Sequence, residues 1–149
     1  MKHNLLKPGP VALFVVLELN LSPAISCSCL RPPPPKEALA KSGAVFAGTV
    51  IDVKENSIGH YRTVQFRVDK YWKGASTETA FVTTALNSAA CGYEFARGRR
   101  YLVYSYARKG QKYWSTNLCT RTAELAVAQA DLTALGAGKT PRKSVNKSS

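Results

Sequence analysis

The cysteines are the residues of this 149-residue chain whose type and spacing most directly suggest chemistry. Cys27 and Cys29 are separated by one residue, while Cys91 and Cys119 stand alone. A Cys-x-Cys pair could form half of a thiolate metal site or a redox pair, but neither distant cysteine has a close-spaced partner and redox motifs favour two intervening residues. An even number of cysteines in an oxidising compartment instead favours two disulfides. Three connectivities are open, and the sequence alone does not choose among them.

Side chains that commonly catalyse reactions are sparse. His60 is the single histidine after residue 26, so a histidine-rich zinc site is excluded, and a catalytic triad would need this histidine beside a nucleophile and a carboxylate. The eight carboxylates after residue 26 are scattered singly: Glu37, Asp52, Glu55, Asp69, Glu78, Glu94, Glu124 and Asp131. We therefore predict that the protein is not an enzyme, that it uses no cofactor, and that the free protein binds no metal.

Residues 1–26 have the pattern of a signal peptide. Lys2 and Lys7 give a basic start, residues 11–17 form an apolar run, and Ala24 and Ser26 supply the small residues expected just before a cleavage site. Cleavage there would make Cys27 the mature N-terminus. Because the apolar run is shorter than the roughly 20 residues that span a bilayer, we predict a secreted protein without a membrane span.

A lipid anchor at Cys27 is the alternative. Ser26 directly before this cysteine fits a bacterial lipidation motif, but Ala24 stands where such a motif prefers Leu. Acylation would also leave one of the other three cysteines without a partner. The chain is therefore predicted to be secreted, with lipid anchoring at Cys27 as the second possibility.

The chain is strongly basic, with a formal net charge of +12. Removal of residues 1–26 takes away two lysines and one glutamate and leaves +11. In a secreted protein this charge attracts acidic polysaccharides, a cell-surface polyanion or an acidic protein face. Nucleic acid is disfavoured as a partner, because the protein is exported and its cations are scattered rather than ordered on one helix.

Residue patterns predict a mainly β domain over residues 27–136 and a disordered basic tail over 137–149. The expected elements are a short helix over 36–41, strands over 45–53, 61–71 and 80–84, a hairpin of 101–107 with 113–118, and a helix over 123–135. Gly48 lies in the middle of the first strand, where a barrel strand often bends or bulges. These elements favour a closed or nearly closed OB-like barrel of about five strands with flanking helices, and a small sandwich is the competing architecture.

Four sequence features together resemble a known family. They are Cys27-x-Cys29 at the expected mature N-terminus, Phe46-x-Gly48-x-Val50, Cys91 followed by Phe95-x-x-Gly98-x-x-Tyr101-Leu102-Val103, and Cys119-x-Arg121-Thr122 before a helix. This pattern resembles the tissue inhibitor of metalloproteinases family and its netrin-like module, in a short single-domain form. The resemblance covers residues 27 to about 135, although the chain lacks the further cysteine pair that the animal inhibitors carry in this domain.

The resemblance implies an OB-like barrel with disulfides between Cys27 and Cys91 and between Cys29 and Cys119. It also implies a secreted inhibitor of zinc metalloendopeptidases. In that family the α-amino nitrogen and carbonyl oxygen of the first cysteine, here Cys27, chelate the zinc of the protease, and the second residue, here Ser28, enters its primary specificity pocket. The alternative is a netrin-like extracellular binding module for an acidic partner, without protease inhibition.

Overall fold

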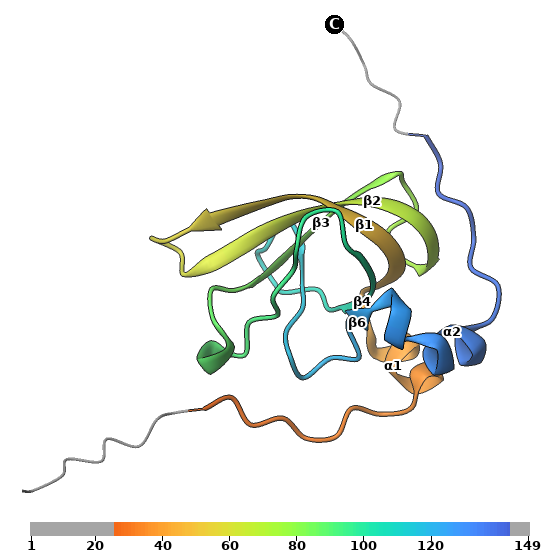
Figure 1. Ribbon diagram of the computed structural model, residues 1–149, viewed down its shortest axis with the longest axis horizontal. Coiled ribbons are helices and arrows are strands. Elements are labelled where there is room, and N and C mark those ends of the chain that lie inside the picture. Colours follow the sequence, from red (N-terminus) through yellow and green to blue (C-terminus); the bar gives the residue numbers. More distant parts are fainter. Residues whose placement is uncertain (1–25, 144–149) are drawn as a thin grey trace, which may run out of the picture.

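The fold is a curled six-stranded half-barrel with two short α-helices, seen in a computed structural model that describes residues 26–143. Figure 1 shows α1 and α2 together at one end of the curled sheet. The elements are α1 (Pro35–Lys41), β1 (Ala44–Asn56), β2 (Tyr61–Lys73), β3 (Thr79–Ala85), the 3₁₀ turn η1 (Ser88–Ala90), β4 (Arg100–Ser105), β5 (Trp114–Ser115), β6 (Ala123–Glu124), the 3₁₀ turn η2 (Leu125–Val127) and α2 (Gln129–Leu135). The predicted mainly β, OB-like class with flanking helices is confirmed.

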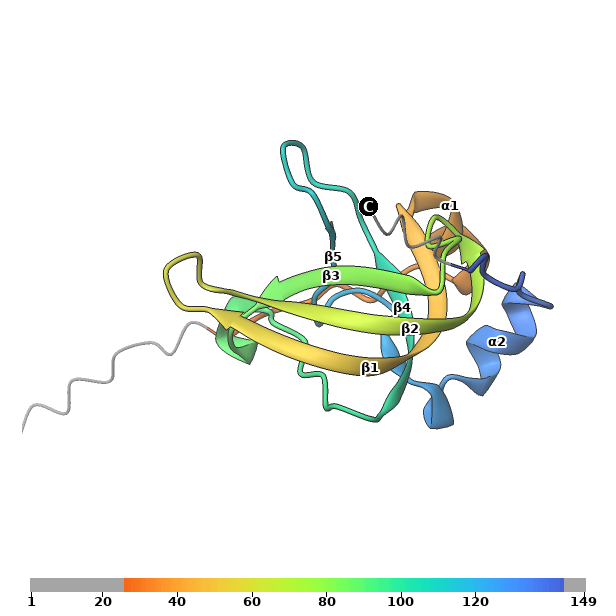
Figure 2. The same cartoon turned by 90° about the horizontal axis from the view of Figure 1, so that it is seen from above.

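Strands β1 and β2 form the long antiparallel hairpin on which the sheet is built, and the strand order is β5-β3-β2-β1-β4-β6. In β2, Val64, Phe66 and Val68 are buried, and the residues between them are partly or fully exposed. This alternation was predicted, and it arises because successive side chains of a strand lie on opposite faces of the sheet. Figure 2 shows the hairpin extending beyond the rest of the barrel at its turn.

The middle of the sheet is covered on both faces. Inside the curl, Phe46, Phe66 and Phe95 form consecutive edge-to-face pairs with ring centroids 5.2 and 5.3 Å apart. On the outside, Val45 and Leu102 are fully buried in a second cluster that includes side chains of both helices. Because β1 is covered on both faces, its first half is a continuous apolar run instead of an alternating one.

The predicted helix over residues 123–135 is wrong in its first half. Ala123 and Glu124 form β6 on the edge of β4, paired with Leu102 and Tyr101, and α2 begins only at Gln129. Helical spacing is therefore realised only at the C-terminal end of that segment. The predicted hairpin of 101–107 with 113–118 is present in shortened form, since Tyr106 bridges Ser115, while β5 also pairs in parallel with β3.

Residues 137–143 differ from the disordered tail expected from residue 137 onward. The backbone of Lys139 exchanges two hydrogen bonds with Tyr71, at 2.7 and 2.9 Å, and Arg142 bonds to the loop after β2. Strand β3 pairs with β2 only as far as Arg67, so the rest of β2 has free backbone groups that this segment satisfies.

The predicted signal peptide falls almost entirely in residues 1–25, which lie outside the described residues, as do residues 144–149 of the predicted tail. In residues 26–143 no helix combines the length and apolar character needed to cross a membrane.

Gly48 of β1 is paired with Val68 of β2, next to an irregularity in the register of the two strands. A Cβ atom at this position would lie 2.6 Å from the carbonyl oxygen of Arg67, which is backbone and cannot move aside. The predicted bend at this glycine is therefore explained by a close approach of two strands.

We expect Gly48→Ala to lower the free energy of unfolding by about 3 kcal/mol, because the added methyl overpacks a fixed backbone contact. Gly98→Ala is the matched control: its φ of 77° strains an alanine, but no atom lies within 4 Å of the added Cβ, so we expect a loss of about 1 kcal/mol. Urea unfolding with the disulfides intact measures both values. Equal losses would contradict the steric explanation.

Candidate functional site: a disulfide-pinned N-terminal segment

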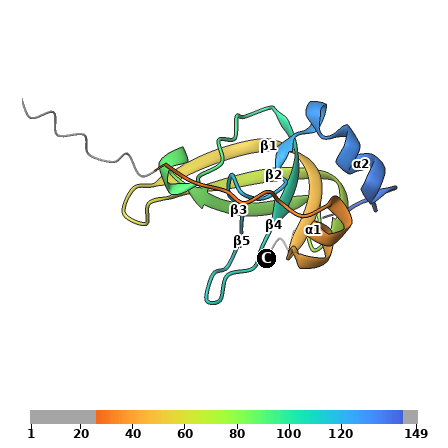
Figure 3. The same ribbon diagram turned by 90° about the horizontal axis from the view of Figure 1, so that it is seen from below.

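The N-terminal segment, residues 26–34, has no helix or strand and is fixed to the barrel by two disulfides. They join Cys27 to Cys91 and Cys29 to Cys119, each with a Cα–Cα distance of 5.0 Å, and these are the pairs that the family resemblance implies. The Sγ atom of Cys27 also lies 3.8 Å from the Sγ atoms of Cys29 and Cys119. The two bridges are therefore adjacent. Figure 3 shows the segment crossing the barrel from the end near η1 to α1.

Cys91 is held by the tight turn of η1. The side chain of Asn87 accepts a hydrogen bond from the Ala90 amide at 3.0 Å, and Cys91 follows in a left-handed conformation with φ 62°. The carbonyl of Cys91 then accepts a bond of 2.9 Å from the Leu118 amide, which ties this turn to the loop that carries the second bridge. The sequence analysis did not identify Asn87, although an Asn before a short turn is a recognisable capping signal.

Cys119 is positioned by hydroxyl and amide side chains around it. The Asn117 side-chain oxygen accepts from the Cys119 amide at 2.9 Å. On either side, Thr116 and Thr122 are buried, their hydroxyl oxygens lie 2.9 Å apart, and each hydroxyl lies within hydrogen-bond distance of the carbonyl of Tyr104. This threonine network was not predicted. Its signal in the sequence is the recurrence of threonine at positions 116, 120 and 122.

Arg121 links the N-terminal segment to α2. It donates to the carbonyl of Pro33 at 3.1 Å and makes two hydrogen bonds to Asp131, at 2.6 and 2.7 Å. The hydroxyl of Tyr104 donates to the same carboxylate at 2.9 Å. Asp131 was predicted to be an isolated carboxylate, but the fold brings it into the most extensive charged contact of the described residues, because α2 packs over β4.

The hydrogen bonds among Arg121, Asp131 and Tyr104, together with burial, shift the pKa values of the carboxyl and the phenol. The hydrogen bonds from Arg121 lower the pKa of the Asp131 carboxyl, and the hydrogen bond from Tyr104 acts in the same direction. Burial raises the pKa of Tyr104, and its bond to Asp131 raises it further. At neutral pH the cluster therefore contains a carboxylate, a guanidinium and a neutral phenol, and each of them has a partner.

The N-terminal segment is largely exposed around its two cysteines. Cys27 is partly buried, whereas Ser28 and Cys29 are exposed. Leu30, 91% exposed, follows directly, and Leu118, 41% exposed, precedes the second bridge. The β1–β2 turn, with Ile58 96% exposed, lies at the same end of the molecule in Figures 1 and 2. Two exposed leucines thus lie next to the disulfide-bonded cysteines in the chain, and exposed apolar side chains are suited to docking on another protein.

The candidate catalytic groups are not assembled into a site. His60 is exposed in the turn between β1 and β2 with φ 52°. The Sγ atoms of Cys27, Cys91 and Cys119 lie within 4.8 Å of one another, but all four cysteines are in disulfides and offer no thiolate. What the arrangement presents is a stretch of backbone, with its amide and carbonyl groups, that two bridges hold in place.

The curled half-barrel with Cys27 and Cys29 joined to two later loops agrees with the netrin-like module that the sequence resembles. No family model matches the chain. The chain is 31% identical over 101 residues to an "NTR domain-containing protein" of Margaritifera margaritifera, an alignment that covers 64% of this chain and 68% of the relative. The chain belongs to the NTR domain family.

We expect Asp131→Asn to lower the free energy of unfolding at pH 7 by about 3 kcal/mol, because it leaves Arg121 without its partner in a largely buried site. The pKa of Asp131 is lowered in the folded state, so its contribution is complete above the unfolded pKa of about 3.9 and is lost as the pH falls through the folded value. The difference between wild type and variant should thus narrow below about pH 4. Urea unfolding across this pH range measures it.

Asp69→Asn is the control for that series. Asp69 is paired with Arg100 at 3.2 Å, but more than half of the Arg100 side chain is exposed, and a surface pair contributes about 0 to 1 kcal/mol. A loss in Asp131→Asn no larger than the loss in Asp69→Asn would contradict the structural role of the Arg121 cluster.

Proposed function

We propose that this protein is a secreted inhibitor of zinc metalloendopeptidases that acts through Cys27 and Ser28. The observation that carries the proposal is the fixation of Cys27-Ser28-Cys29, of which Ser28 and Cys29 are exposed, by two adjacent disulfides at one end of the barrel. Signal peptidase cleavage after Ser26 would make Cys27 the first residue. Its α-amino nitrogen and carbonyl oxygen would then chelate the zinc of the protease.

The chemistry is consistent with the requirements of a catalytic zinc. Such an ion keeps one coordination position for water, and an amine with a neighbouring carbonyl can displace that water as a bidentate ligand. The amine must be neutral to bind. An α-amino group with a pKa of about 7.7 to 8.0 loses its proton readily near neutral pH when a metal competes for it.

Rigidity would keep the cost of docking low. The disulfides hold Cys27 and Cys29, the proline run after Arg31 restricts the backbone, and Arg121 bonds to Pro33 at 3.1 Å. A segment that is already ordered loses little conformational entropy when it binds. Leu30 and Leu118, exposed beside the bridges, would supply apolar contacts to the surface of the protease.

A netrin-like binding module for an acidic partner, without protease inhibition, is the second candidate function. The net charge of +11 that remains after removal of residues 1–26 favours it, as does an exposed pair of cations, Arg108 and Lys109, that have no ion pair in the described structure. Attraction to an acidic surface requires no free amine at Cys27, so the two functions can be tested separately.

We expect the cleaved protein to inhibit at least one zinc endopeptidase, and one Ala added before Cys27 to weaken inhibition by about 1,000-fold or more, because the extra residue removes the amine from the metal and loses about 4 kcal/mol. A fluorogenic peptide assay gives the inhibition constants. The control is the same Ala added after Ser149, which leaves the N-terminus unchanged.

Equal potency of the N-terminally extended protein would contradict zinc chelation by Cys27. Mass spectrometry of the secreted protein tests the same requirement directly. An acylated Cys27, or a leader that is still attached, would exclude a free amine and leave the binding-module function.

Substitution of Ser28 tests the proposed specificity contact. Because Ser28 is exposed, Ser28→Leu should leave the melting temperature unchanged. We expect this variant to shift inhibition toward proteases with deep apolar specificity pockets by about tenfold, the effect of one or two buried methylene groups. Inhibition constants against a panel of zinc endopeptidases measure the shift, and an unchanged ranking would contradict the proposed role of Ser28.

A further inference from the structure

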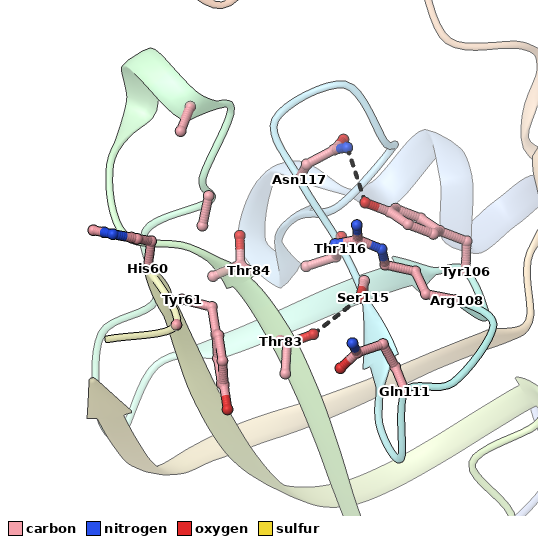
Figure 4. Close-up of a pocket in the computed structure, with 13 residues that line it drawn as sticks. His60, Tyr61, Thr83, Thr84, Tyr106, Arg108, Gln111, Ser115, Thr116 and Asn117 are labelled. Carbon is pink, nitrogen blue, oxygen red and sulfur yellow. Dashed lines mark hydrogen bonds between the residues drawn. The ribbon is translucent and has the colours of Figure 1, made fainter. Parts of the chain in front are cut away.

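A polar pocket of about 380 Å³ lies between the β1–β2 turn, β3 and the β4–β5 loop. It is formed by parts of the chain far apart in sequence, and Ala90, the neighbour of disulfide-bonded Cys91, lies on its wall. Figure 4 shows Tyr61 and Tyr106 on opposite sides of this pocket, with Arg108 and Gln111 on the side formed by the β4–β5 loop. No aspartate or glutamate lies among the described residues that line it.

Several polar groups of the pocket are already bonded within the protein. The Asn117 side-chain oxygen accepts from the Cys119 amide at 2.9 Å. Thr83 donates to the Trp114 carbonyl at 3.2 Å and shares a bond of 2.9 Å with Ser115. A ligand that enters therefore meets few free acceptors on these walls.

The donors, by contrast, are available. In the described part of the chain the Arg108 and Gln111 side chains have no hydrogen bond or ion pair. Tyr106 accepts a bond of 3.3 Å from Asn117 and keeps its own hydroxyl hydrogen. A guanidinium with free N–H groups is the side chain best suited to a carboxylate or sulfate. The pocket thus favours an anionic ligand rich in acceptors.

The aromatic walls narrow the class of ligand further. A sugar ring has an apolar C–H face that packs on an aromatic ring and a rim of hydroxyls that bond to amide and hydroxyl groups. Tyr61 and Tyr106 offer the rings, and Gln111 and Asn117 offer amides. The β4–β5 loop continues with Lys109 and Lys112, two further exposed cations outside the pocket, which would attract neighbouring acidic units of a chain.

We propose that this pocket binds one acidic sugar unit of an extracellular polysaccharide, with Arg108 bound to its carboxylate or sulfate group. The proposal specifies the partner of the second candidate function and does not depend on zinc chelation by Cys27. Lys109 and Lys112 attract the polysaccharide, whereas Arg108, Gln111 and the two tyrosines select the sugar.

Titration calorimetry with a heparin tetrasaccharide in 150 mM NaCl tests the proposal. We expect wild-type protein to bind it and Arg108→Gln to weaken binding by about tenfold, the effect of one charged hydrogen-bonding contact. Lys109→Gln is the matched control, since it removes one cation from the same loop outside the pocket, and we expect less than about a twofold change. Equal losses of affinity in both variants would contradict binding in the pocket, because they would indicate a general charge attraction without a defined site.

Two further measurements separate the remaining outcomes. A glutamate hexapeptide that bound as tightly as the tetrasaccharide would overturn the assignment to a sugar, as would absence of tetrasaccharide binding by the wild type. The protease assay on Arg108→Gln should give the wild-type inhibition constant, so loss of sugar binding and loss of inhibition are distinguishable. An unchanged melting temperature shows that the exposed Arg108 is not needed for folding.

Discussion

The two adjacent disulfides are the constraint on which the candidate site depends. Residues 26–34 form no helix or strand, so no ladder of backbone hydrogen bonds holds them to the barrel. The bridges close loops with sequence separations of 64 and 90 residues, and by a chain-entropy estimate each stabilises the fold by roughly 4 to 5 kcal/mol, not additively because the loops overlap. Without these disulfides, few contacts would hold the N-terminal segment against the barrel.

The partners of these bridges are themselves held by polar contacts instead of long secondary structure. Cys91 depends on the capped turn after Asn87, and Cys119 lies among threonine hydroxyls that bond to β4. Arg121 then extends the same region to Asp131 on α2. The short helix is thus connected to the N-terminal segment through one guanidinium. A buried charge with complete hydrogen bonding is tolerated in this position, whereas an unpaired one would be costly.

The two proposed binding activities occupy neighbouring but distinct surfaces. The exposed Ser28 and Cys29, with Leu30 beside them, suit a protein partner, whereas the pocket at Arg108 offers donors to an acidic ligand. Membership of the NTR domain family is compatible with either activity, because a fold does not determine what its surface binds. Both surfaces lie at the loops that the disulfides tie together, where backbone is rigid without being buried.

The sequence by itself determined the features that depend on local patterns. The alternation of β2, the bend at Gly48, the short helix begun by Pro35 and the unusual Cys-x-Cys spacing could all be read from neighbouring residues, since side-chain period and backbone restriction are local properties. The pairing of the four cysteines, in contrast, rested on a family resemblance, because spacing alone leaves three connectivities open.

Only the tertiary structure decided the features made by distant segments. Ala123 and Glu124 joined β4 and not a helix, and Lys139 paired with Tyr71, because both strands had free backbone groups at those places. Asp131 met Arg121, and the pocket at Arg108 took shape between the β1–β2 turn, β3 and the β4–β5 loop. Such contacts supply hydrogen-bond partners to buried polar groups and to strand edges, and these groups lose their water partners only when the chain folds.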